Sequence, residues 1–469
     1  MGSHSYFSAM PAELTDNILW QLDSIKALGR LIRVSRFILR RFQVQKEIII
    51  YRVLCNELGP VLVDAIFLRI FPYARSRTSA HENVEYWDRI HEMTTVYRSM
   101  LSRDASCDGD TAQVSTAIPS LVELTELCHT HYKMQFVADT YLSLRLDQFD
   151  ASGIRTVPLS VPERQRVLRA FYRRQILCNA WAPTTREAQW SEQDTIAFGC
   201  PFEGEGRRLG LLTAFESWEL QQVDHAESMV AGLCCALCQA CDETDHPMGN
   251  DQLGTIYSMT SALVQFMQAN AHITEIAIRT MSLNLRLPQL SHPDSTDGMN
   301  RYYERLNSYL LLCLDWAWQQ HRSLMFPGLG RTQPGQQIET QEQEQEQEQE
   351  QEQEQEQEKA TVEYVGDGVN LPPFGWIDAA DSVCIDWFGN ALQQWIPLPE
   401  NLTGEETATV YFARLASFRV WREFGFALWD RWRVEALKEL PECKPLRTGW
   451  LLSWDLNVVM NNGTRLPTD

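Results

Sequence analysis

Apolar residues recur at helical spacing along most of this 469-residue chain, and strand-like alternation is nowhere sustained. The clearest helix start is Ser160, which stands three residues before Glu163 as in a capping box, with Pro162 in the first turn. On this helix one stripe is apolar (Leu168, Phe171, Tyr172, Ile176) and arginines cover the rest (Arg164, Arg166, Arg169, Arg173, Arg174). Because no repeat of fixed period accompanies these patterns, we predict an all-α protein with a large, irregular helical body.

Composition divides the chain into four parts. Residues 1–46 form a small helical motif, and residues 47–330 form the helical body. Residues 331–366 contain nine uninterrupted Gln-Glu repeats, in which each Glu meets another Glu four residues on. Like charges at that spacing disfavour a helix, so we expect a disordered low-complexity insertion. Residues 367–469 are rich in tryptophan and should pack back onto the body, although a separate aromatic peptide-binding module is the alternative.

Helical spacing within these parts gives approximate boundaries for individual helices. We predict helices within 48–54, 61–71, 81–101, 211–240, 253–274, 300–325 and 405–440, the last with a kink at Gly425, and one or two more within 119–149.

The stretch from Met10 to Phe42 contains the pattern for three short helices. Pro11 marks the start of the first, whose stripe is Leu14, Ile18 and Leu22, broadened by Leu19 and Trp20. Asp23 and Ser24 can cap a second helix with Ile25, Leu28, Leu31 and Ile32 on its apolar face, and Ser35 can cap a third with Phe37, Ile38 and Phe42. A unit of about thirty residues cannot bury this much apolar surface alone, so we expect it to need a partner.

The order Met10-Pro11, Glu13-Leu14, Ile18, Leu22, Leu28, Leu31 and Val34-Ser35-Arg36 resembles the F-box, the helical motif that docks on the Skp adaptor of cullin-based ubiquitin ligases. The resemblance covers about residues 8–46, with Met10 in place of the usual Leu and Phe37 as the nearest aromatic where the family has Trp. It implies adaptor-binding roles for Met10, Pro11, Leu14, Ile18, Leu22, Leu28, Leu31 and Val34. The alternative is an ordinary amphipathic helical hairpin at the start of an interaction scaffold with no ligase role.

Later segments extend the resemblance. Residues 161–179, 215–233 and 424–437 look like the helical region that follows the F-box in a poorly characterised group of fungal F-box proteins. The resemblance therefore implies a substrate receptor that binds a Skp-type adaptor, and through it a cullin, while its body recruits a protein target that the sequence does not name.

Charge is distributed unevenly. Residues 24–46 contain seven basic side chains and no Asp or Glu, whereas the whole chain has a net charge of −21 and a pI of about 5.0. This cationic segment favours an acidic partner surface, such as an adaptor of acidic character. A solvated helix face and a phosphate-binding helix are the alternatives, but the acidity of the remaining chain argues against a nucleic-acid partner.

Two clusters could carry chemistry. The first, Cys234, Cys235, Cys238 and Cys241, shares a helical stripe with apolar residues, which favours cysteines packed in the core over metal ligands. The second, Cys128 with His129 and His131, has no companion motif. No catalytic signature occurs, so we predict a chain that is not an enzyme and holds no cofactor or metal.

The N-terminal residues and the cysteines indicate the cellular compartment of the protein. The N-terminal residues lack the apolar segment of a secretory signal, and the longest charge-free run, residues 253–274, contains too many polar residues for a membrane span. Twelve scattered cysteines indicate reduced thiols, so we expect a cytoplasmic or nuclear protein with no membrane partner.

Overall fold

The computed structural model describes residues 10–71, 80–105, 118–153, 158–181, 197, 210–283, 369–370, 373 and 425–438. Within these ranges 85% of the residues are helical and none is in a strand, which confirms the all-α prediction. In the same ranges no helix combines the length and the apolar character that crossing a membrane requires.

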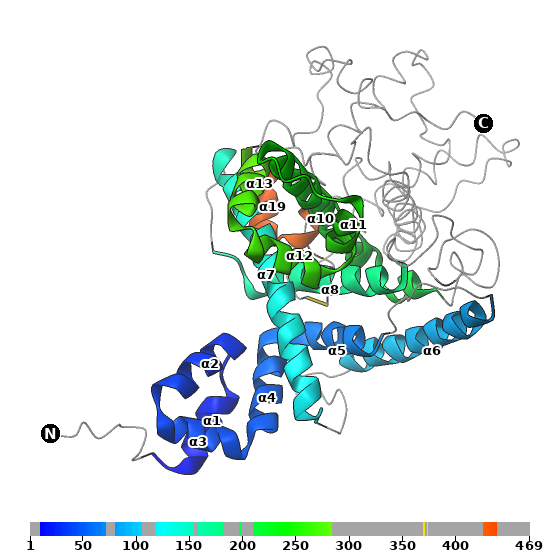
Figure 1. Cartoon of the computed structure of the whole chain (residues 1–469). Coiled ribbons are helices and arrows are strands. Elements are labelled where there is room, and N and C mark those ends of the chain that lie inside the picture. The colour runs from blue at the N-terminus through cyan, green and yellow to red at the C-terminus, as the bar shows by residue number, and fades with distance from the viewer. Residues whose placement is uncertain are drawn as a thin grey trace, which may run out of the picture.

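The N-terminal unit consists of three short helices that pack on the fourth. They are α1 (Ala12–Trp20), α2 (Ile25–Val34), α3 (Arg36–Val44) and α4 (Lys46–Leu58). The predicted caps are confirmed: Ser24 Oγ accepts from the Ala27 N–H at 3.2 Å, and Ser35 Oγ accepts from the Ile38 N–H at 3.5 Å. Figure 1 shows α1, α2 and α3 gathered at one end of the molecule, and α4 leading from them into the body.

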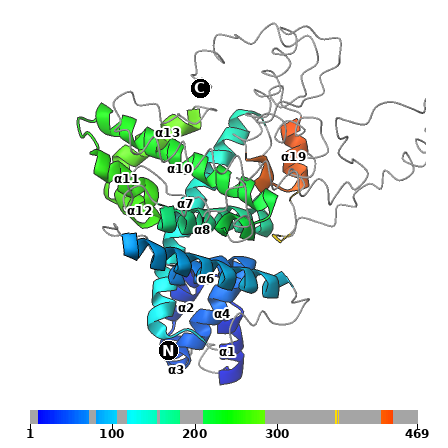
Figure 2. The same cartoon turned by 90° about the vertical axis from the view of Figure 1, so that its right-hand side faces the viewer.

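The body is built around α8. Its described elements are η2 (Gly59–Val61), α5 (Leu62–Ile70), α6 (Ala80–Ala105), α7 (Leu121–Ala151), α8 (Val161–Trp181), η5 (Leu211–Ala214), α10 (Ser217–Glu243), α11 (Asn250–Ser258), α12 (Thr260–Ala269) and α13 (Ala271–Leu283). The later elements η6 (Phe426–Leu428) and α19 (Arg431–Lys438) return to this body, as Figure 2 shows. Helix α8 contacts η2, α5, α7, α10, α11 and η6, so it is covered on most sides.

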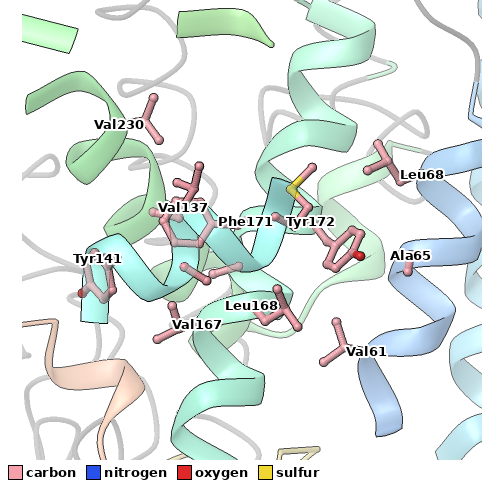
Figure 3. Close-up of a cluster of buried hydrophobic side chains, with 14 of the residues drawn as sticks. Val61, Ala65, Leu68, Val137, Tyr141, Val167, Leu168, Phe171, Tyr172 and Val230 are labelled. Atoms are coloured by element: carbon pink, nitrogen blue, oxygen red, sulfur yellow. The ribbon is translucent and has the colours of Figure 1, made fainter. Parts of the chain in front are cut away.

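A continuous apolar core fills the space around α8. Val61, Ala65 and Leu68 approach from η2 and α5, while Val137 and Tyr141 of α7 and Val230 of α10 approach from the other side (Figure 3). The predicted stripe on α8 is part of this core, since Leu168, Phe171, Tyr172 and Ile176 are all buried. The capping box that starts the helix is also present, with the Ser160 N–H donating to Glu163 Oε2 at 3.0 Å.

The arginines of α8 do not form a solvated face, which corrects the simple amphipathic interpretation of this helix. Four of them are buried, namely Arg166, Arg169, Arg173 and Arg174, and Arg164 alone of the five is exposed. They are paired with carboxylates that come from other elements: Asp64 of α5, Glu219 and Glu227 of α10, and Asp430 before α19. Helix α8 is therefore buried on most of its surface, and most of its polar face is buried by ion pairing.

Several predicted boundaries need correction. The segment 253–274 is three helices rather than one, with breaks at Met259 and Asn270. Gln175 stabilises the first break, between α11 and α12. Its Nε2 donates to the Ser258 carbonyl at 3.0 Å, and its Oε1 accepts from the Thr260 N–H at 2.8 Å. The helix predicted from residue 211 begins only at Ser217, after the short turn η5, whereas residues 121–151 form the single helix α7.

The described residues 425–438 of the tryptophan-rich region pack on the body. Gly425, where the described part of this segment begins, has a left-handed conformation (φ 73°), and η6 lies between it and α19. The prediction of a helix over residues 405–424 lies outside the described residues. Trp429 is buried against Tyr141 and Phe149 of α7. The predictions for 300–325, for the insertion 331–366 and for most of 367–469 lie outside the described residues.

Candidate docking surface

Helix α1 has its apolar stripe turned away from the protein. Leu14 is 52% exposed and Ile18 is 38% exposed, whereas Thr15 and Asp16 are buried beneath them. Leu19 is fully buried, so it belongs to the core face and does not broaden the exposed stripe as predicted. A helix that buries two polar residues while exposing two large aliphatic ones has the reverse of the usual amphipathic arrangement.

Specific polar contacts hold α1 in this orientation. Asp16 forms a two-point ion pair with Arg41 of α3, and Gln45 Nε2 also donates to Asp16 Oδ2 at 3.1 Å. Thr15 Oγ1 donates to the Pro11 carbonyl at 3.3 Å, in the first turn of the helix. Chiefly because of its hydrogen bond to Asp16, Arg41 has a raised pKa. The buried polar side of α1 is therefore satisfied within the chain, which leaves Leu14 and Ile18 on the surface.

Replacement of Asp16 by alanine should loosen α1 without unfolding the body. Arg41 and Gln45 would lose their common acceptor, while Leu19 would still be buried. We expect faster amide hydrogen exchange in α1 and α3 and unchanged exchange in α8 and α10. Glu13→Ala, an exposed change on the same helix, is the control and should leave the exchange of α1 close to that of the parent chain. Equal exchange in the two variants would contradict the assigned role of Asp16.

The remaining residues implied by the resemblance are not equally accessible. Pro11 is exposed and Val34 is 78% exposed. Met10, Leu22 and Leu31 are half-buried, and Leu22 and Leu31 pack on the core. Leu28 is buried, so in this chain it supports the surface from beneath and is not itself on it.

Sequence reasoning missed two exposed apolar residues. Val44, at the end of α3, is 73% exposed, and Ile48, in the first turn of α4, is 38% exposed. Their spacing of four residues was the available signal, but the helix break at Gln45 lies between them. We refer to the exposed apolar residues of α1 to α4, namely Leu14, Ile18, Val34, Val44 and Ile48, as the apolar surface.

The N-terminal unit is fixed to the body by residues near the end of α4. Asn56 Nδ2 donates to the carbonyls of Trp20 (2.7 Å) and Leu22 (2.9 Å), and Glu57 Oε2 accepts from the Ile25 N–H at 2.8 Å. The other oxygen of Glu57 lies 3.4 Å from Nε2 of the buried His131 in α7. His131 is thus part of the joint between the unit and the body. Of the cluster Cys128, His129 and His131, this residue therefore has a structural role.

A cationic surface lies on α2, α3 and the start of α4. It consists of Lys26, Arg30, Arg33, Arg36, Arg40 and Lys46, all exposed. Arg41, the seventh basic residue of this segment, is paired with Asp16. Within the part of the chain that the structure describes, none of the six forms an ion pair. The predicted concentration of positive charge is therefore accessible to a partner.

The cysteine cluster on α10 lies in the packed interior. Cys234, Cys235 and Cys241 are buried, and burial raises the pKa of Cys235 and of the half-buried Cys238 to about 12. These thiols are therefore protonated near neutral pH, whereas the thiolate is the form that attacks electrophiles and binds metals. Across the described ranges no group of three or more His, Cys, Asp and Glu side chains is arranged to hold a metal ion.

Comparison of the chain with models of known protein families, with curated proteins and with solved structures found no match.

Proposed function

We propose that this protein is a non-catalytic substrate receptor of a cullin-type ubiquitin ligase, docking a Skp-type adaptor through its N-terminal helices. The observation that carries the proposal is the orientation of α1, which exposes Leu14 and Ile18 and buries Asp16. Polar contacts between Asp16 of α1 and residues Arg41 and Gln45 maintain this orientation, so Leu14 and Ile18 stay exposed while the polar side of α1 is held against α3. The F-box-like spacing of the sequence supplies the identity of the proposed partner.

The proposed mechanism is proximity. The adaptor would hold α1 and its neighbours, and the fixed joint at Asn56 and Glu57 would transmit that position to the body. A target bound to the body would then be held near the ubiquitin-charged enzyme at a high effective concentration. No side chain of this protein takes part in a bond-making step.

The double variant L14D/I18D tests the docking step. Two carboxylates would have to be desolvated in the interface, and loss of two apolar anchors of hot-spot size corresponds to roughly a 100-fold or greater loss of affinity. Isothermal titration of the purified chain with a Skp-type adaptor measures it. V161D is the matched control, since Val161 is also an exposed aliphatic residue near a helix start, but in α8. Unchanged adaptor affinity in L14D/I18D would refute the proposal.

A scaffold without a ligase role is the second candidate. It is favoured by the way the N-terminal unit shares the body's core, because Leu19, Leu28, Ile38 and Phe42 belong to the same buried cluster as α7 and α8. Under this alternative the parent chain itself would show no affinity for the adaptor. The titration described above therefore separates the two functions before any variant is made.

A further inference from the structure

We propose that the cationic surface of α2, α3 and α4 is a docking site for this chain's own Gln-Glu run, residues 341–358. The proposal goes beyond adaptor docking and does not require it, because it rests on the exposed cations of α2, α3 and α4 and not on the apolar residues proposed to bind the adaptor. It begins from the imbalance of charge: six exposed cations without an ion pair in the described chain, on a protein with a net charge of −21.

The first step is complementarity of charge. The run contains nine glutamates and no basic residue in 18 positions, and it is the densest concentration of one charge in the sequence. Most of the remaining chain is acidic and repels it, whereas residues 24–46 contain seven basic residues and no acidic one. Complementary surfaces at short range attract, and like charges disfavour the other placements.

The second step is complementarity of spacing. Lys26 and Arg30 stand four residues apart on the exposed side of α2, which separates them by about 6 Å along the helix axis. Arg36 and Arg40 have the same spacing on α3. In an extended chain, alternate residues recur every ~6.6 Å, so successive glutamates of a Gln-Glu repeat match successive cations of either helix.

The third step is reach. Val369, eleven residues beyond the end of the run, is fixed to the body because its carbonyl accepts from Arg169 at 3.0 Å. The 29 residues from Gln341 to Val369 can span about 95 Å at full extension. For comparison, the 31-residue helix α7, which contacts both α4 and α8, is about 46 Å long. The N-terminal unit is therefore within range of the run.

The fourth step favours this occupant over a separate acidic protein. A tethered segment is present at an effective concentration in the mM range, so even a weak electrostatic contact is populated. The contact should weaken with salt, since the Debye length falls from about 8 Å at physiological ionic strength to about 3 Å at 1 M. Any acidic partner of α2 and α3 would have to displace the run.

Carbodiimide crosslinking of the full chain, followed by mass spectrometry, tests the proposal. The reagent joins a carboxylate directly to an amine, and the chain has only three lysines before residue 300: Lys26, Lys46 and Lys133. We expect glutamates of 341–358 to be joined to Lys26 or Lys46 at least about five-fold more often than to Lys133 of α7, and this preference to disappear in 1 M NaCl. Lys359, next to the run, reports that the reagent reached these carboxylates.

The variant R30Q/R33Q/R36Q/R40Q retains both lysines and removes the neighbouring charge. The four side chains are exposed, so the melting temperature should not change, while the crosslinks to Lys26 and Lys46 should fall to the level of Lys133. A mixture of ¹⁵N-labelled and unlabelled chains distinguishes contacts within one chain from contacts between copies. Crosslinks that reach Lys133 equally, that form only between copies, or that survive in the variant would each overturn the proposal.

Discussion

Replacement of Arg173 by methionine is expected to lower the free energy of unfolding by about 3–5 kcal/mol, because it removes one partner from a buried ion network. Arg173 is buried, its Nε donates to Asp64 Oδ1 at 2.8 Å, and its Nη1 lies 2.7 Å from Glu219 Oε1. The guanidinium also stacks 4.7 Å from the ring centre of Phe215. Methionine would fill much of the volume but would leave two buried carboxylates to share Arg169, which lies 3.7 Å from Asp64 and 3.2 Å from Glu219.

Urea denaturation monitored by tryptophan fluorescence gives the free-energy change. Arg164→Met on the same helix is the matched control, because Arg164 is 56% exposed and lies 3.7 Å from an equally exposed Asp139. The control should change stability by less than about 0.5 kcal/mol. A loss of stability in Arg173→Met no larger than that of the control would show that the buried network has no role in stability.

The loss should also depend on pH. Burial acts to raise the pKa of Glu219, but Arg173 and Arg169 outweigh it and hold that pKa below its usual value. In the parent chain, Glu219 therefore contributes stability above its unfolded-state pKa, and this contribution is lost as the pH falls through its lower folded-state value. Without Arg173, less positive charge opposes the effect of burial, so the pKa of Glu219 rises. Protonation of Glu219 then removes the cost of a buried carboxylate in the variant. The difference in stability between parent and variant should shrink between pH 7 and pH 4.

The starts of the helices could be predicted from the sequence because their determinants are local. Ser24, Ser35 and Ser160 each accept a hydrogen bond from an N–H three residues on, and the chain carries this information within one turn. The division of residues 253–274 into three helices could not be predicted in the same way. The break between α11 and α12 depends on Gln175, a side chain more than eighty residues earlier, which binds the backbone there.

The orientation of the helices depends on contacts that are distant in sequence. Arginines at helical spacing predict a solvated face unless their carboxylate partners are known, and those of α8 come from Asp64, Glu219 and Asp430. The apolar stripe of α1 was predictable, but which side of the helix faces the protein is decided by Asp16 with Arg41 and Gln45. Exposure of Leu14 and Ile18 thus follows from a polar contact that an apolar pattern does not contain.

The segment 425–438 closes the body from a point far along the chain. Arg166 Nε donates to the Leu428 carbonyl at 3.0 Å, and Gln222 Nε2 donates to the Ala427 carbonyl at 2.9 Å. Glu163, which caps α8 through Ser160, also accepts from Arg433 Nε at 2.9 Å. These contacts join the first two turns of α8, and α10, to residues more than 200 positions later, so the segment is part of the body's folded core.

Trp429→Ala is expected to destabilise the protein by about 3–5 kcal/mol through the cavity left by a fully buried indole. The indole is stacked on Tyr141, with ring centres 6.4 Å apart, and meets the edge of Phe149 at 5.5 Å. Trp432→Ala is the matched control, because Trp432 is only half-buried and its main contact is Arg433, 4.1 Å from its ring. Trp432→Ala should lower the free energy of unfolding by only about 1 kcal/mol.

Cleavage of the full chain into two fragments allows the contribution of Trp429 to be measured as the affinity between those fragments. A site-specific protease sequence placed within 341–358 would allow the folded protein to be cut between the body and the segment 425–438. Because a buried aromatic anchor and buried ion pairs join the two fragments, they should co-elute on size exclusion after cleavage. The same cut in Trp429→Ala should yield fragments that separate on dilution, whereas Trp432→Ala should remain associated. Separation in the parent chain, or association in all three, would show that Trp429 is not the anchor that holds the segment to α7 and α8.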